Sequence, residues 1–560
     1  MGKPILTLKD IKKLPYAATS FGVMRERENV YVDKTAMIAR IAETENAPVF
    51  LSRPRRFGKT LLVSTFESLF SRGLQDFKDL DIDTGEEKWT DKTYKVIRLD
   101  FSLYADDSCE DLIKDLTQEL VVHFSDMKKI NPLDPQGNYQ NPSYILWEGV
   151  REAASKSIVL LIDEYDSPVS HHLNNKDETD KIMNVLKSFF AAVKRFEEKF
   201  RFVFITGITR VADISLFSVF NNLNDISCDD EFATLLGITD EELKRYFDPY
   251  ARNAASVLDM SISEVYDRMK ALYDGFQFSI ETNMTVYNPW SVLSFLSKPE
   301  RGFKNYWYST SGGTPTILMK YLENTDFQDL FNKLSYRVKE GSLTDYLAEE
   351  DMLLSKSAPD QIPIEMLLYQ TGYFTLRKDS PEIAKLAIPN DEVSESLIKL
   401  SLDINHMTPS LSTKSKLNKI GALVDSGDIA GIFDVFNAAL CEGVSSNAKV
   451  FDDENTVRDF IYALLPRHGF LKSRVTGNAG GFSGIEIKTG TVRLMIAFKM
   501  IRNEFTREAA QETVMKEALN ELRTHGYSSA AEDMKLIQVG MVISPARKKL
   551  TEYRILDDRT

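Results

Sequence analysis

The stretch "VFLSRPRRFGKTLLVS" (49–64) decides the fold of the first part of this chain. Residues 47–52 form an apolar run typical of a buried strand, and 61–71 have helical spacing. Between them stands Gly58-Lys59-Thr60, which between a strand and a helix is the mark of a phosphate-binding loop. The loop pattern has a glycine five residues before Gly58, and here that position is Arg53. The stretch therefore predicts a phosphate site whose first half is altered.

Two later segments supply the side chains that such a site needs. "VLLIDE" ends an apolar run in Asp163, which can hold Mg²⁺, and Glu164, which can polarise an attacking water. "FVFITGITRV" places Thr206 at the end of the next apolar run, within reach of a γ-phosphate or the water. Arg210 follows, where it could approach charge that develops in the transition state. Order and spacing together favour a nucleotide site over a chance Gly-Lys-Thr.

Strand-like and helix-like segments alternate through the first 240 residues, and the apolar runs are nearly continuous. This pattern predicts a parallel sheet covered on both faces. Strands are expected at 47–52, 95–102, 157–166 and 200–210, and helices at 61–71, 109–124 and 180–196. Thr239 and Glu242 then form a capping box that begins a helix.

We expect three domains, all within an α/β class. Residues 1–238 form the parallel-sheet domain, 239–395 a helical and mixed middle domain, and 396–560 a second α/β domain. In the middle domain, 366–377 is expected to be a pair of strands around a glycine turn. In the last domain, a helix over 454–470 precedes a hairpin (484–490 and 492–500), a helix near 506–524 and a strand over 536–544.

Composition narrows the classes of function. The 560 residues are 43% hydrophobic, enough for several packed domains. The net charge of −14 argues against broad nonspecific DNA binding, although a local basic groove is compatible with it. Three cysteines without metal spacing suit a reducing compartment. With no signal-peptide core and no run near ~18 apolar residues, we expect a cytoplasmic protein without a membrane span; signal-less export stays open.

The motifs together resemble a known family, the bacterial and fungal AAA-ATPase-like proteins with a C-terminal PD-(D/E)XK nuclease-like domain. The resemblance runs through most of residues 15–380. The matching motifs are "YVDKT" (31–35), "RPRRFGKT" (53–60), "LLIDEYDSPV" (160–169), "TGITRV" (206–211), "FNNLNDIS" (220–227), "YDGFQF" (273–278), "VYNPWSVLSFL" (286–296) and "LLYQTGYFTL" (367–376). The family writes its loop with Arg-Pro-Arg-Arg, so Arg53 looks like the family variant.

The resemblance implies that ATP and Mg²⁺ are the cofactors. ATP would be held by Gly58, Lys59, Thr60 and the adjoining Leu61, with Thr60 and Asp163 on the metal. Arg55 and Arg56 have two open interpretations: they reach phosphate, in this subunit or a neighbour's, or they pair with acids at the surface. ATPases of this clade often act as oligomers, so a homo-oligomer or another protein partner is compatible with the chain.

In the C-terminal region the family resembles two-carboxylate nucleases. There an Asp on one central strand and a Glu-x-Lys on the next hold Mg²⁺ and place the nucleophile. Here Gly484 stands where Asp is expected, and Glu-x-Lys has become Ala497-Phe498-Lys499, with Gln511 in the following helix. Because hard cations need anionic oxygens, loss of both carboxylates predicts a pseudonuclease.

One acid could substitute. Glu486 lies on the same strand face as Gly484 and begins its own Glu-x-Lys, Glu486-Ile487-Lys488. Asp452, Asp453 and Glu454 begin the preceding helix and could reach over. Three hypotheses therefore stand: an ATPase coupled to an inactive nuclease-like domain, an ATP-regulated nuclease with relocated acids, and a non-catalytic interaction or effector scaffold. Nucleic acid stays open as a partner.

Overall fold

The structure is a computed structural model that describes seventeen segments of the chain. They are 12–15, 18–45, 47–85, 89–105, 108–210, 220–309, 316–323, 347–348, 363–380, 383–404, 410–443, 451, 454–465, 471–476, 483–501, 507–524 and 534–556. The chain divides into two compact units, which we call unit 1 (1–300, 306–324 and 345–393) and unit 2 (301–305, 325–344 and 394–560). The division near 393 lies close to the expected boundary at 395, and the helices expected in a middle domain belong to unit 1.

Unit 1 is built on a five-stranded sheet with the strand order β2-β3-β4-β1-β5, in which each neighbouring pair is parallel. The expected parallel sheet is confirmed, with strands near each predicted position. The fifth strand was missed because two polar residues carry no apolar signal. The strands are β1 (Val49–Ser52), β2 (Lys95–Asp100), β3 (Ile158–Asp163), β4 (Phe200–Gly207) and β5 (Asn224–Asp225).

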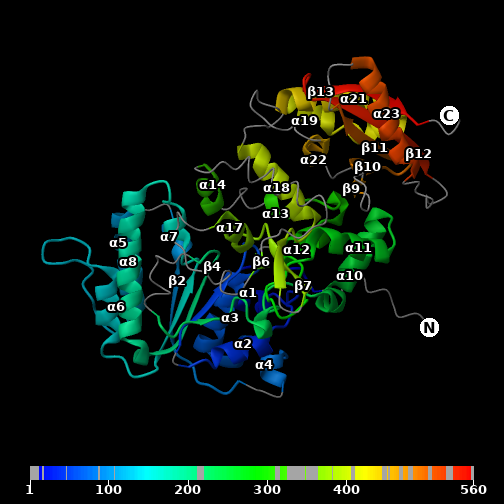
Figure 1. Ribbon diagram of the computed structural model, residues 1–560. Helices are drawn as coiled ribbons and strands as arrows, with labels where there is room; N and C mark the ends of the chain where they lie inside the picture. Colours follow the sequence, from blue (N-terminus) through cyan, green and yellow to red (C-terminus); the bar gives the residue numbers. More distant parts are fainter. Residues whose placement is uncertain are drawn as a thin grey trace, which may run out of the picture. The chain divides into compact units, whose positions relative to one another are not determined.

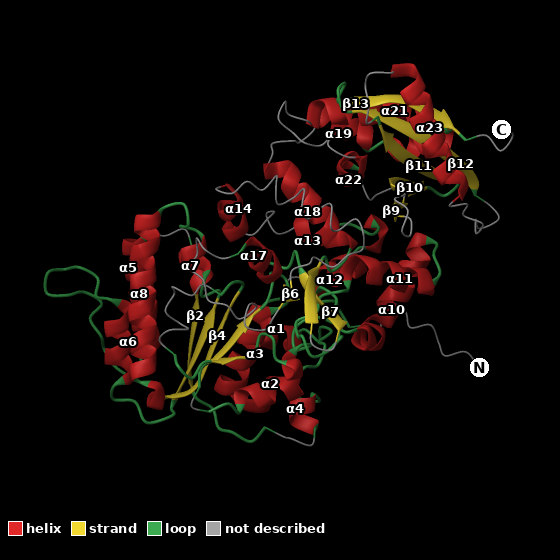
Figure 2. Ribbon diagram, viewed as in Figure 1, coloured by secondary structure: helices red, strands yellow, loops and turns green. Residues whose placement is uncertain are grey.

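Helices cover both faces of this sheet (Figures 1 and 2). On one face, α3 (Lys59–Arg72) packs on β2, β3 and β4. On the other, alternate strand residues form one buried core with α5 (Cys109–Phe124), α6 (Pro142–Val150) and α8 (Lys176–Arg195). Ile97, Leu99, Ile158, Leu160 and Ile162 belong to that second face. Because neighbouring residues of a strand point to opposite faces, the alternate positions of β2 and β3 face α3.

Further helices and a small sheet complete unit 1. The predicted capping box is present, since Thr239 and Glu242 bond reciprocally at the start of α10. The expected strand pair at 366–377 is half wrong: residues 364–370 are the helix α17, which is followed by Gly372 (φ +87°) and then a strand. The run Met366–Tyr369 contains no β-branched residue, so nothing opposes a helix there.

The remaining helices and strands of unit 1 are α1 (Phe21–Glu26), α2 (Thr35–Ala42), α4 (Asp81–Thr84), α7 (Ser167–Ser170), α10 (Asp240–Leu258), α11 (Ile262–Tyr273), α12 (Pro289–Ser297), α13 (Tyr306–Ser309), α14 (Thr316–Glu323), α17 (Ile364–Gln370), β6 (Leu347–Ala348), β7 (Thr375–Ser380) and β8 (Ile383–Ala387).

Unit 2 has its own five-stranded sheet with the order β13-β12-β11-β10-β9. The β11–β12 pair is parallel, and the other three pairs are antiparallel. The expected succession of helix, hairpin, helix and strand is found, with one strand added at each sheet edge. After α18 (Asp391–Ile404), which begins in unit 1, the elements are α19 (Leu411–Leu417), α20 (Ile420–Ser426), α21 (Ile429–Gly443), α22 (Glu454–Leu464), β9 (Leu471–Thr476), β10 (Ser483–Lys488), β11 (Val492–Met500), α23 (Arg507–Thr524), β12 (Lys535–Ser544) and β13 (Lys549–Ile555).

Candidate functional site

The loop between β1 and α3 ends at Gly58, which caps the N-terminus of α3. Gly58 caps α3 with φ +99°, a left-handed conformation that favours glycine. A Cβ at Gly58 would meet nothing within 4 Å, so the backbone angle rather than space demands this residue. The free N–H groups of the first turn and the helix dipole make this end of α3 suited to an anion.

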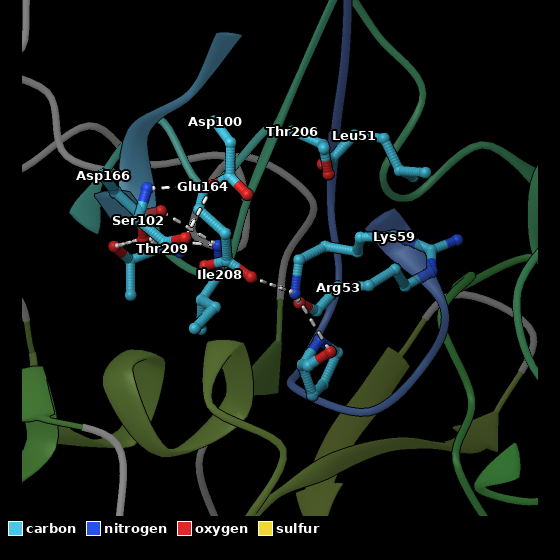
Figure 3. Close-up of polar contacts among 11 residues, drawn as sticks. Leu51, Arg53, Lys59, Asp100, Ser102, Glu164, Asp166, Thr206, Ile208 and Thr209 are labelled. Atoms are coloured by element: carbon cyan, nitrogen blue, oxygen red, sulfur yellow. Dashed lines mark hydrogen bonds and ion pairs between the residues drawn. The ribbon is translucent and has the colours of Figure 1, made fainter. Parts of the chain in front are cut away.

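Lys59 is the buried cation of the loop. Its ammonium donates to the carbonyl oxygens of Arg53 (3.0 Å) and Pro54 (3.4 Å) and lies 3.7 Å from Glu164 Oε1 (Figure 3). Only 4% of the side chain is exposed. The lysine is therefore held across the loop by contacts that a phosphate oxygen could replace.

Asp163, the last residue of β3, is a buried carboxylate without a partner. It is fully buried, and neither oxygen accepts a hydrogen bond from a described residue. Burial, and then the neighbouring charge of Glu164, raise the pKa of Asp163 to about 6. The Lys59 charge and the Thr60 hydroxyl, which lies close by but outside hydrogen-bonding geometry, act in the opposite direction. A buried anion is costly unless something compensates it, so these oxygens fit a cation held beside Thr60.

The two acids after Asp163 have different roles. Glu164 is a quarter exposed, faces the Lys59 ammonium and adopts φ +50°, a strained angle for a residue with a side chain. Asp166 is 2% exposed and accepts hydrogen bonds from the Ile208 amide and from the amide and hydroxyl of Thr209. Figure 3 shows Asp166 directed toward these two residues. Asp166 therefore fixes the segment after β4, whereas Glu164 is available for chemistry.

The residues predicted on and after β4 lie differently from what the sequence suggested. Thr206 is fully buried, and its hydroxyl donates to the Leu51 carbonyl of β1 at 2.6 Å. Arg210 is 3% exposed and forms an ion pair with Asp225 at 2.9 Å. Neither lines the cavity described below, and Val211 lies outside the described residues. In this conformation the structure gives Thr206 and Arg210 positions that support the sheet and its edge.

Arg53, the residue in place of the usual glycine, is a structural side chain. Its guanidinium donates to the carbonyl oxygens of Ser227 (2.6 Å), Ser52 (3.0 Å) and Phe232 (3.2 Å). It also stacks on the ring of Phe278, 4.2 Å from the centroid. Burial lowers the pKa of Arg53 to about 10. Arg53 therefore ties the loop to segments near β5 and to the "YDGFQF" motif.

Other motif residues support the loop from behind. Phe57 packs edge-on against both Phe276 and Phe278, with centroids 4.9 and 5.2 Å away. A Cβ on Gly372 would come within 2.7 Å of the Pro54 Cβ. The motifs "YDGFQF" and "LLYQTGYFTL", distant in sequence, thus pack around the phosphate loop.

The loop opens on a cavity of about 610 Å³ inside unit 1. Arg55 and Arg56 line it, and the Arg56 guanidinium lies 4.2 Å above the ring of Trp290 at the start of α12. Of the predicted residues, those lining the cavity are Arg55, Arg56, Gly58, Lys59, Thr60, Leu61 and Glu164. Trp290, the last residue of "VYNPW", is half-buried and lines this cavity.

Sequence reasoning missed Asp100 and Ser102, which also line this cavity. A signal was present: the predicted strand "KVIRLD" ends in an acid, as "VLLID" does. Without the strand order, the ends of β2 and β3 could not be placed side by side.

In unit 2, the positions expected to hold nuclease ligands are cross-strand partners. Gly484 on β10 pairs directly with Ala497 on β11. Ala497 is fully buried and packs with Met495, Ala518 and Leu522. Apolar contacts therefore occupy the place where two carboxylates would meet. Residues 477–482 of the Gly-rich turn, and Asp452 and Asp453, lie outside the described residues.

The remaining polar residues of that region are engaged with each other. Glu486 is 2.5 Å from Arg493 and 3.5 Å from Lys488. Lys499 lies between Glu521 (2.5 Å) and Glu454 (3.1 Å); burial acts to lower the pKa of Lys499, but these two acids outweigh it and raise the pKa. The Gln511 amide donates to the Thr551 hydroxyl at 3.3 Å. Among the described residues, no three Asp, Glu, His or Cys side chains gather as a metal site.

Comparisons with known proteins agree with a phosphate-binding loop in the N-terminal region. Residues 15–217 match the family model described as "Predicted AAA-ATPase", so this segment is a predicted AAA-ATPase-like domain. The chain is also 28% identical over 433 residues to an "Uncharacterized protein in vnfD 5'region" of Azotobacter chroococcum mcd 1, across 76% of this chain and 77% of that protein. The described helices include none with the length and apolar character to cross a membrane.

Proposed function

We propose that this protein binds ATP with Mg²⁺ at the β1–α3 loop and hydrolyses it. One observation carries the proposal: Lys59 and Thr60 begin α3, which packs on β3, and β3 ends in Asp163, a buried carboxylate whose oxygens accept no hydrogen bond from a described residue. The match to an AAA-ATPase-like model supports it. In a strand–loop–helix connection with only a structural role, a buried charge without compensation would cost stability and contribute nothing.

Each residue of the loop has a distinct task in this proposal. The first-turn amides of α3 and the Lys59 ammonium would bind the outer phosphates, and Arg55 and Arg56, which line the same cavity, would add positive charge. Thr60 and Asp163 would hold the Mg²⁺, which when bound neutralises phosphate charge. Glu164, partly exposed and facing the Lys59 ammonium, would polarise the attacking water.

An apolar pocket next to the loop fits the base of the nucleotide. It has a volume of about 120 Å³ and shares Met24, Gly58 and Leu61 with the larger cavity. Its walls are mainly aliphatic and aromatic, with Val30, Ile38, Leu235, Leu236 and Phe247 among them. A flat, weakly polar ring next to a phosphate loop suits such a pocket.

ATP turnover by the purified full chain tests the proposal. Lys59→Ala should lower turnover by about 10²–10³-fold, the usual effect of removing a group that stabilises developing charge. Glu164→Gln should lower turnover by about 10²–10⁴-fold and leave nucleotide affinity near the wild-type value, because it removes only the base. Nucleotide binding without turnover in the wild type would favour the scaffold hypothesis.

For unit 2 we propose a nuclease-like fold that has lost its metal site. Support comes from the Gly484–Ala497 pairing, the apolar packing of Ala497, and the ion pairs that occupy Lys499 and Glu486. The full chain should therefore cleave neither DNA nor RNA with Mg²⁺ or Mn²⁺. Cleavage that disappears in Glu486→Ala, but not in Glu517→Ala at an exposed acid of α23, would instead establish the relocated-acid nuclease.

A further inference from the structure

A second acid, Asp100, ends the strand beside Asp163. Residues 95–100 of β2 pair in parallel register with 158–163 of β3, and the last pair is Asp100 with Asp163. In-register residues of neighbouring parallel strands point to the same face, and their strands are about 4.8 Å apart. Two carboxylates therefore end adjacent strands in equivalent positions.

Both carboxylates face α3. The residues just before them, Leu99 of β2 and Ile162 of β3, belong to the core on the opposite face of the sheet. Because neighbouring residues of a strand point to opposite faces, the acid that follows each of them lies on the α3 face. On that face, Arg98 of β2 reaches Glu67 of α3 at 2.8 Å. Asp100, two residues further along, therefore approaches the first turn of α3.

The local contacts of Asp100 leave one of its oxygens available for a ligand. Oδ1 accepts hydrogen bonds from the Ser102 amide (3.0 Å) and hydroxyl (2.6 Å), which begin a short 3₁₀ turn. Oδ2 accepts no hydrogen bond from a described residue. Asp100 and Thr60 both line the nucleotide cavity, and Figure 3 shows Asp100 next to Glu164.

The charge of Lys59 lowers the pKa of Asp163, but the lysine makes no ion pair with either acid. The Lys59 ammonium is bound to two loop carbonyls and Glu164, and no ion pair joins it to Asp100 or Asp163 among the described residues. Both oxygens of Asp163, a fully buried residue, accept no hydrogen bond from a described residue. Two neighbouring carboxylates and a hydroxyl are a set of hard oxygen donors, which Mg²⁺ prefers.

We propose that Asp100 is a second carboxylate of the divalent-cation site, acting with Asp163 and Thr60, either on the ion or through one water. This inference rests on the proposed function, because the ion enters with the nucleotide. The proposed site therefore has two acids, one at the end of β2 and one at the end of β3, rather than the β3 acid alone. This role would account for an acid at the end of "KVIRLD" that lines the cavity.

Mn²⁺ binding, followed by electron paramagnetic resonance in the presence of a non-hydrolysable ATP analogue, tests the proposal without turnover. Asp100→Asn should raise the Kd for Mn²⁺ about 10–100-fold, the range for residues that support metal ligands. Asp163→Asn should raise it at least as much. Glu67→Gln is the matched control, because it removes one negative charge from the same side of the sheet outside the cavity, and it should leave the Kd within about 2-fold.

The outcomes separate this inference from the function on which it rests. Binding of the analogue without metal should be unchanged or tighter in Asp100→Asn, because a negative charge near the phosphates is gone. If Asp163→Asn loses Mn²⁺ and Asp100→Asn does not, Asp100 is only a turn residue and the inference is wrong. Loss of metal-free analogue binding in Asp100→Asn would likewise overturn it. A wild-type chain that binds no analogue refutes the proposed function instead.

Discussion

Replacing Arg53 by glycine restores the usual phosphate-loop sequence, and the structure predicts that this restoration is harmful. The Arg53 guanidinium donates three hydrogen bonds to backbone carbonyls and stacks on Phe278. Arg53 is not among the residues with positive φ, so its backbone does not require glycine. The variant therefore loses contacts and gains no relief of strain.

The size of the loss follows from these contacts. Three hydrogen bonds from a charged donor contribute about 1.5–3 kcal/mol each, or roughly 5–9 kcal/mol together. Burial lowers the pKa of Arg53 to about 10, which corresponds to about 3 kcal/mol against its charged form. The difference predicts that Arg53→Gly destabilises unit 1 by about 2–6 kcal/mol. The added freedom of glycine in the unfolded chain increases the loss by about 0.5–1 kcal/mol.

Urea unfolding followed by tryptophan fluorescence measures this loss in the right unit. All four tryptophans of the chain belong to unit 1: Trp89, Trp147, Trp290 and Trp307. Arg55→Ala is the control, because Arg55 lines the cavity without a hydrogen bond to a described residue, and its effect should stay within about 0.5 kcal/mol. An Arg53→Gly variant as stable as wild type would show that the guanidinium contacts contribute nothing, and the structural role given to Arg53 would be wrong.

Three further predictions follow from single contacts. Because the pKa of Asp163 is raised to about 6, the folded state binds a proton more tightly than the unfolded chain does, and the free energy of unfolding falls as the pH rises from about 4 to 6. Asp163→Asn removes this loss, so it should stabilise the metal-free protein by about 3 kcal/mol at pH ~7.5 and hardly at pH ~4. Urea unfolding at the two pH values measures the difference. Gly372→Ala should weaken nucleotide binding and lower stability more than Gly137→Ala does. The two glycines have similar φ, +87° and +88°, but only a Cβ at Gly372 would meet Pro54. Equal losses of stability in the two variants would contradict this contact. Lys499→Met should destabilise unit 2 by about 2–3 kcal/mol, because it leaves Glu454 and Glu521 without their shared cation. Faster hydrogen exchange of the β11 amides should show the loss of stability, and changing both acids to Gln should restore the protection of these amides.

Local patterns were sufficient for the elements that carry long apolar runs. The runs before Arg53, Asp163 and Gly207 predicted β1, β3 and β4, and the Thr239–Glu242 capping box predicted the start of α10. Short or polar elements gave no such signal, which is why β5 was missed. The helix at 364–370 was mistaken for a strand because a short apolar run fits both periods.

The sequence by itself was enough to predict the loop residues Gly58, Lys59 and Thr60 and the acids Asp163 and Glu164, because their chemistry depends on residue type and on short spacing. Only the tertiary structure decided which strands are neighbours. That order placed Asp100 beside Asp163, turned Arg210 to Asp225, and made Arg53 a buried support. It also set Gly484 opposite Ala497, in a place filled by apolar packing. The contact of Arg53 with Phe232 joins residues 179 positions apart, and no local periodicity encodes which distant backbone will lie next to a given side chain.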